Sequence, residues 1–142
     1  MIVFENTIEI ARDPAAVFAY LADPEHLPAW NYAIEETRKL DAGPVGVGSR
    51  YVQTRTAPTR SEETFEVTEF EPGRRLALRG RFGPFTGELG YVLAPSGPGT
   101  ELTNTVALDG SRLLAPLAAR PIRTAVAANL QVLRRTLERD VS

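Results

Sequence analysis

The chain has 142 residues, a formal net charge of −2 and no cysteine. Its length suits a single domain over residues 1–142 with a sizeable core. The lack of cysteine excludes disulfides, thiolate metal sites and cysteine nucleophiles, and the charge argues against nucleic acid as a partner. No stretch approaches the roughly 20 apolar residues of a membrane span, and the first ten residues do not resemble a signal peptide. We therefore expect a cytoplasmic protein.

The first thirty residues predict one strand followed by two short helices. Apolar and polar residues alternate over 4–10, as in a half-buried strand. Asp13 then precedes a proline and an apolar run to residue 21, which predicts a helix with Asp13 as its N-cap. Asp23 repeats this arrangement and predicts a second short helix through Leu27.

The middle of the chain predicts antiparallel hairpins. Glycines in the segment 41–48 do not match a dinucleotide fingerprint or a P-loop, and a strand follows them, so we interpret this segment as a turn. The connection 80–87 contains Phe82 and Phe85 and is either a mobile apolar loop or a hairpin turn packed by its own phenylalanines. The expected strands cover residues 34–40, 49–56, 62–70, 75–79, 88–93 and 101–108.

The last long segment, residues 111–139, predicts the only long helix. Apolar residues recur in it at intervals of four, three and four, which places them on one face that requires a partner. Pro116 and Pro121 predict a kink or a short leading helix before Ile122. The residues of the apolar face are Val126, Leu130, Leu133 and Leu137.

These elements predict an α+β fold in which a curved antiparallel sheet of about seven strands wraps round the C-terminal helix. The element order and the stretch from Ile8 to Trp30, with support from Gly46-Val-Gly48 and the segments 65–76 and 99–103, carry a resemblance to a known superfamily. The chain resembles the helix-grip fold of the START and birch-pollen-allergen-like (SRPBCC) superfamily, in its polyketide cyclase/dehydrase branch. That resemblance implies a hydrophobic cavity between sheet and helix. Members include lipid carriers, ligand-binding proteins, coenzyme Q-binding proteins and aromatase/cyclases.

The inward rows of such a sheet supply the candidate ligand-binding residues. Gln53 and Asn104 are polar exceptions among apolar neighbours, and each must find a partner in protein, water or ligand. The alternatives are a core amide satisfied within the protein, or a register that is off by one residue. The residues expected to bind the ligand are Trp30, Tyr51, Gln53, Phe65, Val67, Leu76, Leu78, Phe82, Phe85, Leu89, Tyr91, Asn104, Leu117 and Val126.

The function that we expect is the binding, for carriage or sensing, of a small hydrophobic or amphipathic molecule, without a cofactor. A cyclase/dehydratase enzyme is an alternative, in which Arg55, Tyr51 or Tyr91 would assist proton transfer. A second alternative is a regulatory domain that presents its arginine-rich last helix to a partner. His26 is the only histidine, which excludes a histidine metal cluster, and no catalytic residue is assigned. The sequence leaves the oligomeric state open.

Overall fold

The computed structural model describes residues 1–139 and contains one seven-stranded sheet. The strand order is β1-β7-β6-β5-β4-β3-β2, and every neighbouring pair is antiparallel. The predicted fold class is therefore confirmed. The strands are β1 (Ile2–Ile10), β2 (Ile34–Lys39), β3 (Arg50–Arg55), β4 (Ser61–Glu71), β5 (Arg75–Phe82), β6 (Phe85–Ser96) and β7 (Gly99–Asp109).

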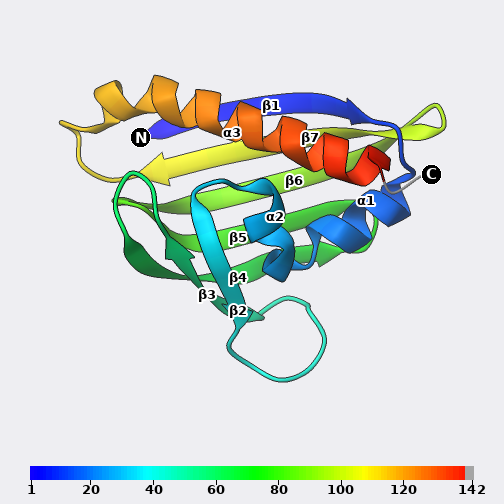
Figure 1. Ribbon diagram of the computed structural model, residues 1–142, viewed down its shortest axis with the longest axis horizontal. Helices are drawn as coiled ribbons and strands as arrows, with labels where there is room; N and C mark the ends of the chain where they lie inside the picture. The colour runs from blue at the N-terminus through cyan, green and yellow to red at the C-terminus, as the bar shows by residue number, and fades with distance from the viewer. Residues whose placement is uncertain (140–142) are drawn as a thin grey trace.

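The helices all lie on one face of this sheet, with the long α3 crossing it lengthwise (Figure 1). Since β1 and β2 form opposite edges, the chain must cross the whole sheet between them. The two short helical segments make that crossing, which explains why they follow the first strand. The helices are α1 (Pro14–Leu21), the 3-10 helix η1 (Pro24–His26), α2 (Leu27–Trp30) and α3 (Ala115–Arg139).

The two Asp-Pro pairs begin helices in different ways. Asp23 accepts a hydrogen bond from the backbone N–H of Glu25 at 3.1 Å, as an N-cap should. Asp13 occupies the N-cap position of α1 with extended backbone, but its side chain makes no capping bond. The second helical segment also continues through α2 to Trp30, beyond the predicted end at Leu27.

The connection over residues 80–87 is a tight hairpin. Strand β5 ends at Phe82 and β6 begins at the paired Phe85, with Gly83 at a positive φ of 66° between them. The hairpin interpretation is confirmed. Gly80 and Gly87 pair across the same hairpin, and a Cβ at either would collide with the backbone of the neighbouring strand. Gly80 thus permits β5 to lie close to β4 at this point, and Gly87 permits β6 to lie close to β7.

Helix α3 begins at Ala115, four residues later than predicted, and is continuous through Pro121. No separate leading helix precedes it in the described part of the chain, so that alternative was wrong, while the kink at the prolines stays a prediction. Pro116 is tolerated because the first N–H groups of a helix have no intrahelical partner. The predicted apolar face is confirmed, since Leu130, Leu133 and Leu137 are at most 2% exposed.

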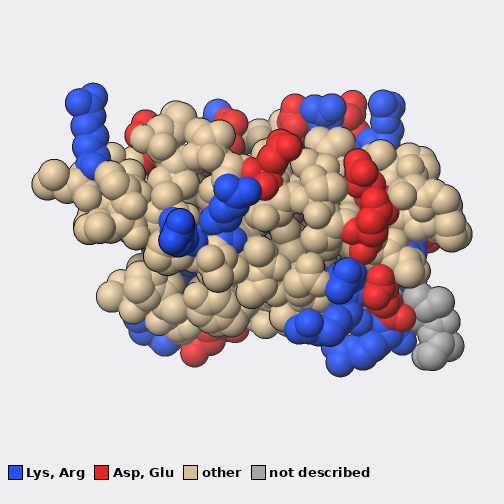
Figure 2. All heavy atoms as spheres, turned by 90° about the horizontal axis from the view of Figure 1, so that it is seen from above, with Lys and Arg blue, Asp and Glu red and all other residues tan. Residues whose placement is uncertain are grey.

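The space between sheet and helices holds two groups of buried apolar side chains. The larger one joins α1 and the end of α3 to the sheet, and the smaller one surrounds Phe85 and Val106 near the start of α3. The predicted inward rows of the strands are confirmed, with only Leu89 less than fully buried. Across the face seen in Figure 2, charges of both signs are interspersed. None of the helices over residues 1–139 is long and apolar enough to cross a membrane.

Candidate functional site

A partly enclosed cavity of ≈ 70 Å³ lies where the two groups of buried side chains meet. A buried water needs about 10–15 Å³, so the cavity has room for about five waters. Its wall is mostly apolar, and among the described residues Arg55 is the only charged one in it. The lining residues are Leu27, Trp30, Asn31, Gln53, Arg55, Phe65, Leu78, Phe82, Leu89, Tyr91, Asn104, Val106, Val126, Asn129 and Leu130.

Most of the residues predicted to bind ligand lie in this wall. The strand residues among them lie on the inward face of the sheet, as the alternation of apolar and polar residues predicted. Residues of α2 and α3 line the opposite side of the cavity. The helix residues Asn129 and Leu130 also line the cavity but were not in the predicted set. The predicted residues found in the wall are Trp30, Gln53, Phe65, Leu78, Phe82, Leu89, Tyr91, Asn104 and Val126.

The other five predicted residues lie elsewhere. Tyr51, Val67 and Leu76 are packed into the larger group of core side chains, where each is 1% exposed. Phe85 belongs to the smaller group and is 3% exposed. Leu117 is on the outer side of α3 and is 76% exposed, because the first half of the helix buries only part of its circumference. None of these five side chains lines the cavity.

A buried ion pair stands at one end of the cavity. The carboxylate of Glu63 accepts hydrogen bonds from Arg55 Nε at 2.9 and 3.1 Å and from Gln53 Nε2 at 3.0 Å. It also accepts from Ser61 Oγ at 3.1 Å and from the backbone N–H of Gly83 at 2.6 Å. The Glu63 side chain is 1% exposed and the Arg55 side chain 16%. All of these donors hold one carboxylate in a fixed orientation.

The protonation state of Glu63 follows from two opposing effects. Burial raises the pKa of this carboxyl, but the hydrogen bonds from Arg55, Gln53 and Gly83 outweigh burial and leave the pKa below its ordinary value. Glu63 is therefore ionised at neutral pH. The position of this residue was detectable in the sequence, because Glu63 precedes Phe65 and Val67 in the same inward alternation.

Gln53 was expected to find a partner in protein, water or ligand, and the structure shows which partner it has. Its amide nitrogen donates a hydrogen bond to Glu63. Gln53 therefore follows the alternative in which the protein itself satisfies a buried core amide. A one-residue error in register is excluded, since Gln53 is 3% exposed and pairs with Glu63 across β3 and β4.

Asn104 differs from Gln53. Its Nδ2 donates to the carbonyl of Gly90 at 3.2 Å, but its buried Oδ1 has no hydrogen-bond partner within residues 1–139. Asn6 lies opposite it on β1, and the buried Nδ2 of Asn6 also has no partner in this part of the chain. An unpaired buried acceptor in a cavity wall is a group that a donor from water or ligand would stabilise.

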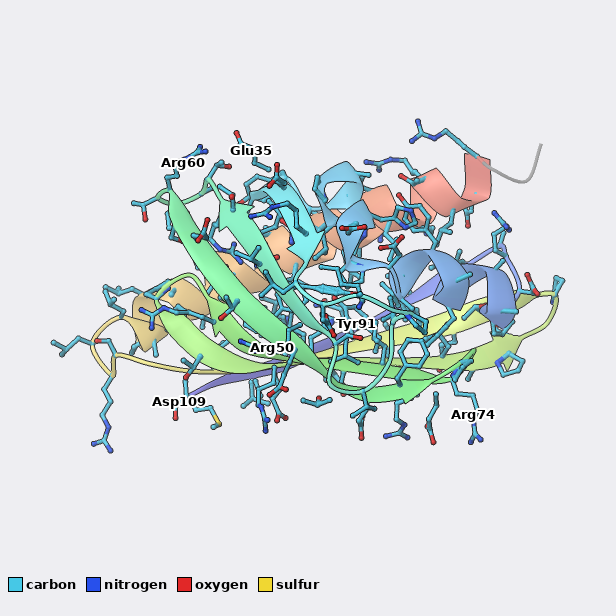
Figure 3. The ribbon with its side chains drawn as sticks, turned by 90° about the horizontal axis from the view of Figure 1, so that it is seen from below. Glu35, Arg50, Arg60, Arg74, Tyr91 and Asp109 are labelled. Carbon is cyan, nitrogen blue, oxygen red and sulfur yellow. The ribbon has the colours of Figure 1, made fainter. Side chains whose placement is uncertain are left out.

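Tyr91 adds a hydroxyl to the same wall. Within the described residues, no protein group forms a hydrogen bond with this hydroxyl. Figure 3 shows Tyr91 between the sheet and the helices, away from the exposed ion pair of Arg60 and Glu35. Burial raises the pKa of Tyr91. Burial and the nearby charges of Asp23 and Glu25 raise the pKa of Tyr51 to about 12. Both phenols are neutral at pH 7 and can donate hydrogen bonds.

The described residues contain no cluster of candidate metal ligands, and the histidine lies outside the cavity wall. No group of three or more His, Asp or Glu side chains in residues 1–139 could hold a metal ion. His26 stacks on the ring of Tyr20 with centroids 4.1 Å apart, and its Nδ1 lies 2.9 Å from the Tyr20 carbonyl oxygen. His26 is not a lining residue of the cavity.

Comparisons with known proteins give one family and many structures of the same fold. The family described as "Polyketide cyclase / dehydrase and lipid transport" matches residues 1–138. An uncharacterized protein of Mycobacterium tuberculosis is 33% identical over 78 residues, which are 54% of this chain and 45% of that protein. The chain thus spans about half the length of the curated relatives that it matches.

Solved structures at low sequence identity show the fold alone. A START superfamily protein from Mycobacterium smegmatis has a TM-score of 0.84 at 16% identity, covering 98% of this chain and 99% of its own. The di-domain aromatase/cyclase StfQ from the steffimycin biosynthetic pathway has a TM-score of 0.79 at 12% identity, covering 98% of this chain and 51% of its own. A third solved structure, that of Ara h 8.0201, has a TM-score of 0.76 at 12% identity and covers 95% of this chain and 96% of its own.

Proposed function

Because this chain belongs to the polyketide cyclase/dehydrase and lipid transport family, we propose that it binds a small hydrophobic or amphipathic molecule in the cavity between the sheet and α3. The observation that carries this proposal is the cavity wall, which is mostly apolar and includes Asn104, a residue whose buried Oδ1 has no hydrogen-bond partner among the described residues. A wall of this kind suits a ligand with an apolar body and few polar groups.

The polar atoms decide how tightly and selectively the ligand is held. Burial of about ten methylenes contributes roughly 8 kcal/mol, against at least about 4 kcal/mol lost on association, so apolar contact alone gives weak binding. Hydrogen bonds to Asn104, Tyr91 or Arg55 would supply the additional stabilisation. A ligand larger than the cavity requires neighbouring side chains to move.

Calorimetric titration with cumene, a compact hydrocarbon, tests whether the cavity binds apolar molecules. We expect cumene to bind the wild-type protein and to bind Val126→Phe at least about tenfold more weakly, because the larger side chain fills the cavity. Leu117→Phe is the matched control on the same helix, since Leu117 is exposed and does not line the cavity. Equal cumene binding by Val126→Phe and the wild type would contradict the proposed site.

Native mass spectrometry with solvent extraction would then identify the natural ligand. The protein is purified from its own host, alongside Val126→Phe and Leu117→Phe. A bound molecule of defined mass should accompany the wild type and Leu117→Phe but not Val126→Phe. The same molecule on all three proteins would place its binding outside the cavity.

A second candidate function is a cyclase/dehydratase reaction, which is favoured by Tyr91 in the cavity wall, a residue whose hydroxyl has no hydrogen-bond partner among the described residues. Because burial raises the pKa of Tyr91, this phenol would act as a hydrogen-bond donor to a substrate oxygen and not as a base. Turnover of a hydroxy-ketone substrate that is lost in Tyr91→Phe without unfolding would support an enzyme. An unchanged product profile with and without the protein would count against it.

A further inference from the structure

The guanidinium of Arg55 has unused donors in the cavity wall. Its Nε is taken by both oxygens of Glu63, at 2.9 and 3.1 Å. Neither Nη nitrogen has a hydrogen-bond partner among the described residues, and Arg55 lines the cavity. Since guanidinium nitrogens only donate, a ligand group that meets them must offer an acceptor oxygen or nitrogen.

The charge of this group is already balanced. Glu63 is ionised and lies against Arg55, so the pair contributes no net charge to the site. Within residues 1–139, Arg55 is the only charged residue in the cavity wall. A carboxylate ligand would therefore leave one uncompensated negative charge in a partly enclosed apolar site, which is costly. A carbonyl oxygen accepts the same hydrogen bonds and adds no charge.

From this geometry we propose that Arg55 binds the carbonyl oxygen of a neutral ligand, and that Glu63 sets the preference for neutral over anionic ligands by balancing the arginine charge. This proposal rests on the ligand binding proposed above and narrows its chemical class. Glu63 is a specificity-determining residue that acts through Arg55. Gln53, Ser61 and Gly83 hold the Glu63 carboxylate in place.

Three probes of nearly equal size separate the contributions of apolar contact, a carbonyl oxygen and a negative charge to binding. Cumene is apolar, acetophenone carries a carbonyl, and benzoate carries a carboxylate. Each is titrated by calorimetry at pH 7 into the wild type and its variants, and only changes relative to the wild type are compared, because the probes differ in their affinity for water.

Glu63→Gln is the decisive variant, because it removes one charge and keeps the side-chain shape. It leaves the positive charge of Arg55 unbalanced, so we expect the affinity ratio of benzoate to acetophenone to rise about tenfold or more. Glu66→Gln is the matched control, since Glu66 is on the same strand but pairs with Arg79 at 2.8 Å on the outer face of the sheet. An unchanged ratio in a folded Glu63→Gln protein would overturn the proposal.

Arg55→Met tests the anchor and does not depend on the folding of Glu63→Gln. We expect its acetophenone affinity to fall about tenfold while its cumene affinity stays within about twofold of the wild type. The double variant Arg55→Met/Glu63→Gln should lose acetophenone affinity equally and gain no benzoate affinity. Circular dichroism verifies the fold of each variant.

The outcomes distinguish this inference from the function on which it rests. Suppose that cumene binds the wild type but that Arg55→Met weakens acetophenone binding no more than cumene binding. Arg55 then does not bind the carbonyl oxygen, while the proposed hydrophobic site is unaffected. If cumene does not bind the wild type at all, the proposed function fails, and the inference fails with it.

Discussion

The layer between the sheet and α3 has two ends that are built differently. At the end near α1, Val17, Leu102 and Leu133 are completely buried in the larger group of core side chains, and none of the three lines the cavity. Toward the middle of the helix, Val126 is only half-buried and the cavity opens beside it. One end therefore fixes the helix to the sheet, while the other combines looser packing with unpaired polar atoms. This division allows a binding site to exist without a loss of the fold.

The largest expected effect is a loss of stability at the packed end. Leu133→Ala should lower the free energy of unfolding by about 2–5 kcal/mol, because it deletes a completely buried side chain and leaves a void. Urea denaturation followed by circular dichroism measures this change.

Val126→Ala is the comparison at the cavity end. Val126 is half-buried and already adjoins empty space, so we expect a loss of about 1 kcal/mol or less. If the two substitutions cost the same free energy, the two ends of the layer are not differently packed.

The next effect is the loss of stability at low pH that follows from protonation of the Glu63 carboxylate. Because the pKa of Glu63 is lower in the folded protein than its ordinary value of 4.5, ionised Glu63 stabilises the fold above that value, and this stabilisation is lost as the pH falls through the folded pKa. The stability difference between the wild type and Glu63→Gln should therefore be constant above about pH 5 and shrink below 4.5. Urea denaturation at a series of pH values measures it.

Glu66→Gln again serves as the control. Glu66 forms an exposed ion pair with Arg79, and exposed pairs contribute little to stability. A Glu63→Gln difference that does not change between pH 6 and pH 3 would show that Glu63 is not stabilised in its ionised form.

Some features of this layer could be predicted from the sequence, and others required the structure. The inward rows follow from strict alternation, which places residues two apart on the same face. The pairing of Arg55 with Glu63 also depends on the β3–β4 register, which the sequence does not determine. The exposure of Leu117 could have been predicted but was not: Leu117 precedes Val126 by nine residues, which at about 100° per residue places it on the side of the helix opposite the apolar face.

A smaller effect is expected from Asn104→Leu. The substitution removes the Oδ1 acceptor, which has no partner among the described residues, and also the 3.2 Å hydrogen bond from Nδ2 to the Gly90 carbonyl, so we expect it to lower stability by about 1 kcal/mol. Binding of 1-phenylethanol, whose hydroxyl can donate to Asn104, should weaken about five- to tenfold, while binding of cumene stays nearly unchanged. Calorimetry compares the two probes. Equal losses for both would exclude Asn104 as a polar anchor.

The smallest effect is expected at the exposed start of α3. Leu117→Ser should change the free energy of unfolding by only about 0.5 kcal/mol, because Leu117 is 76% exposed and buries little apolar surface. Leu130→Ser, on the same helix but 1% exposed, should cost several times more, since it buries a hydroxyl and leaves a void. A cost for Leu117→Ser that approaches that of Leu130→Ser in urea denaturation would mean that the first half of α3 is covered in solution by another apolar surface.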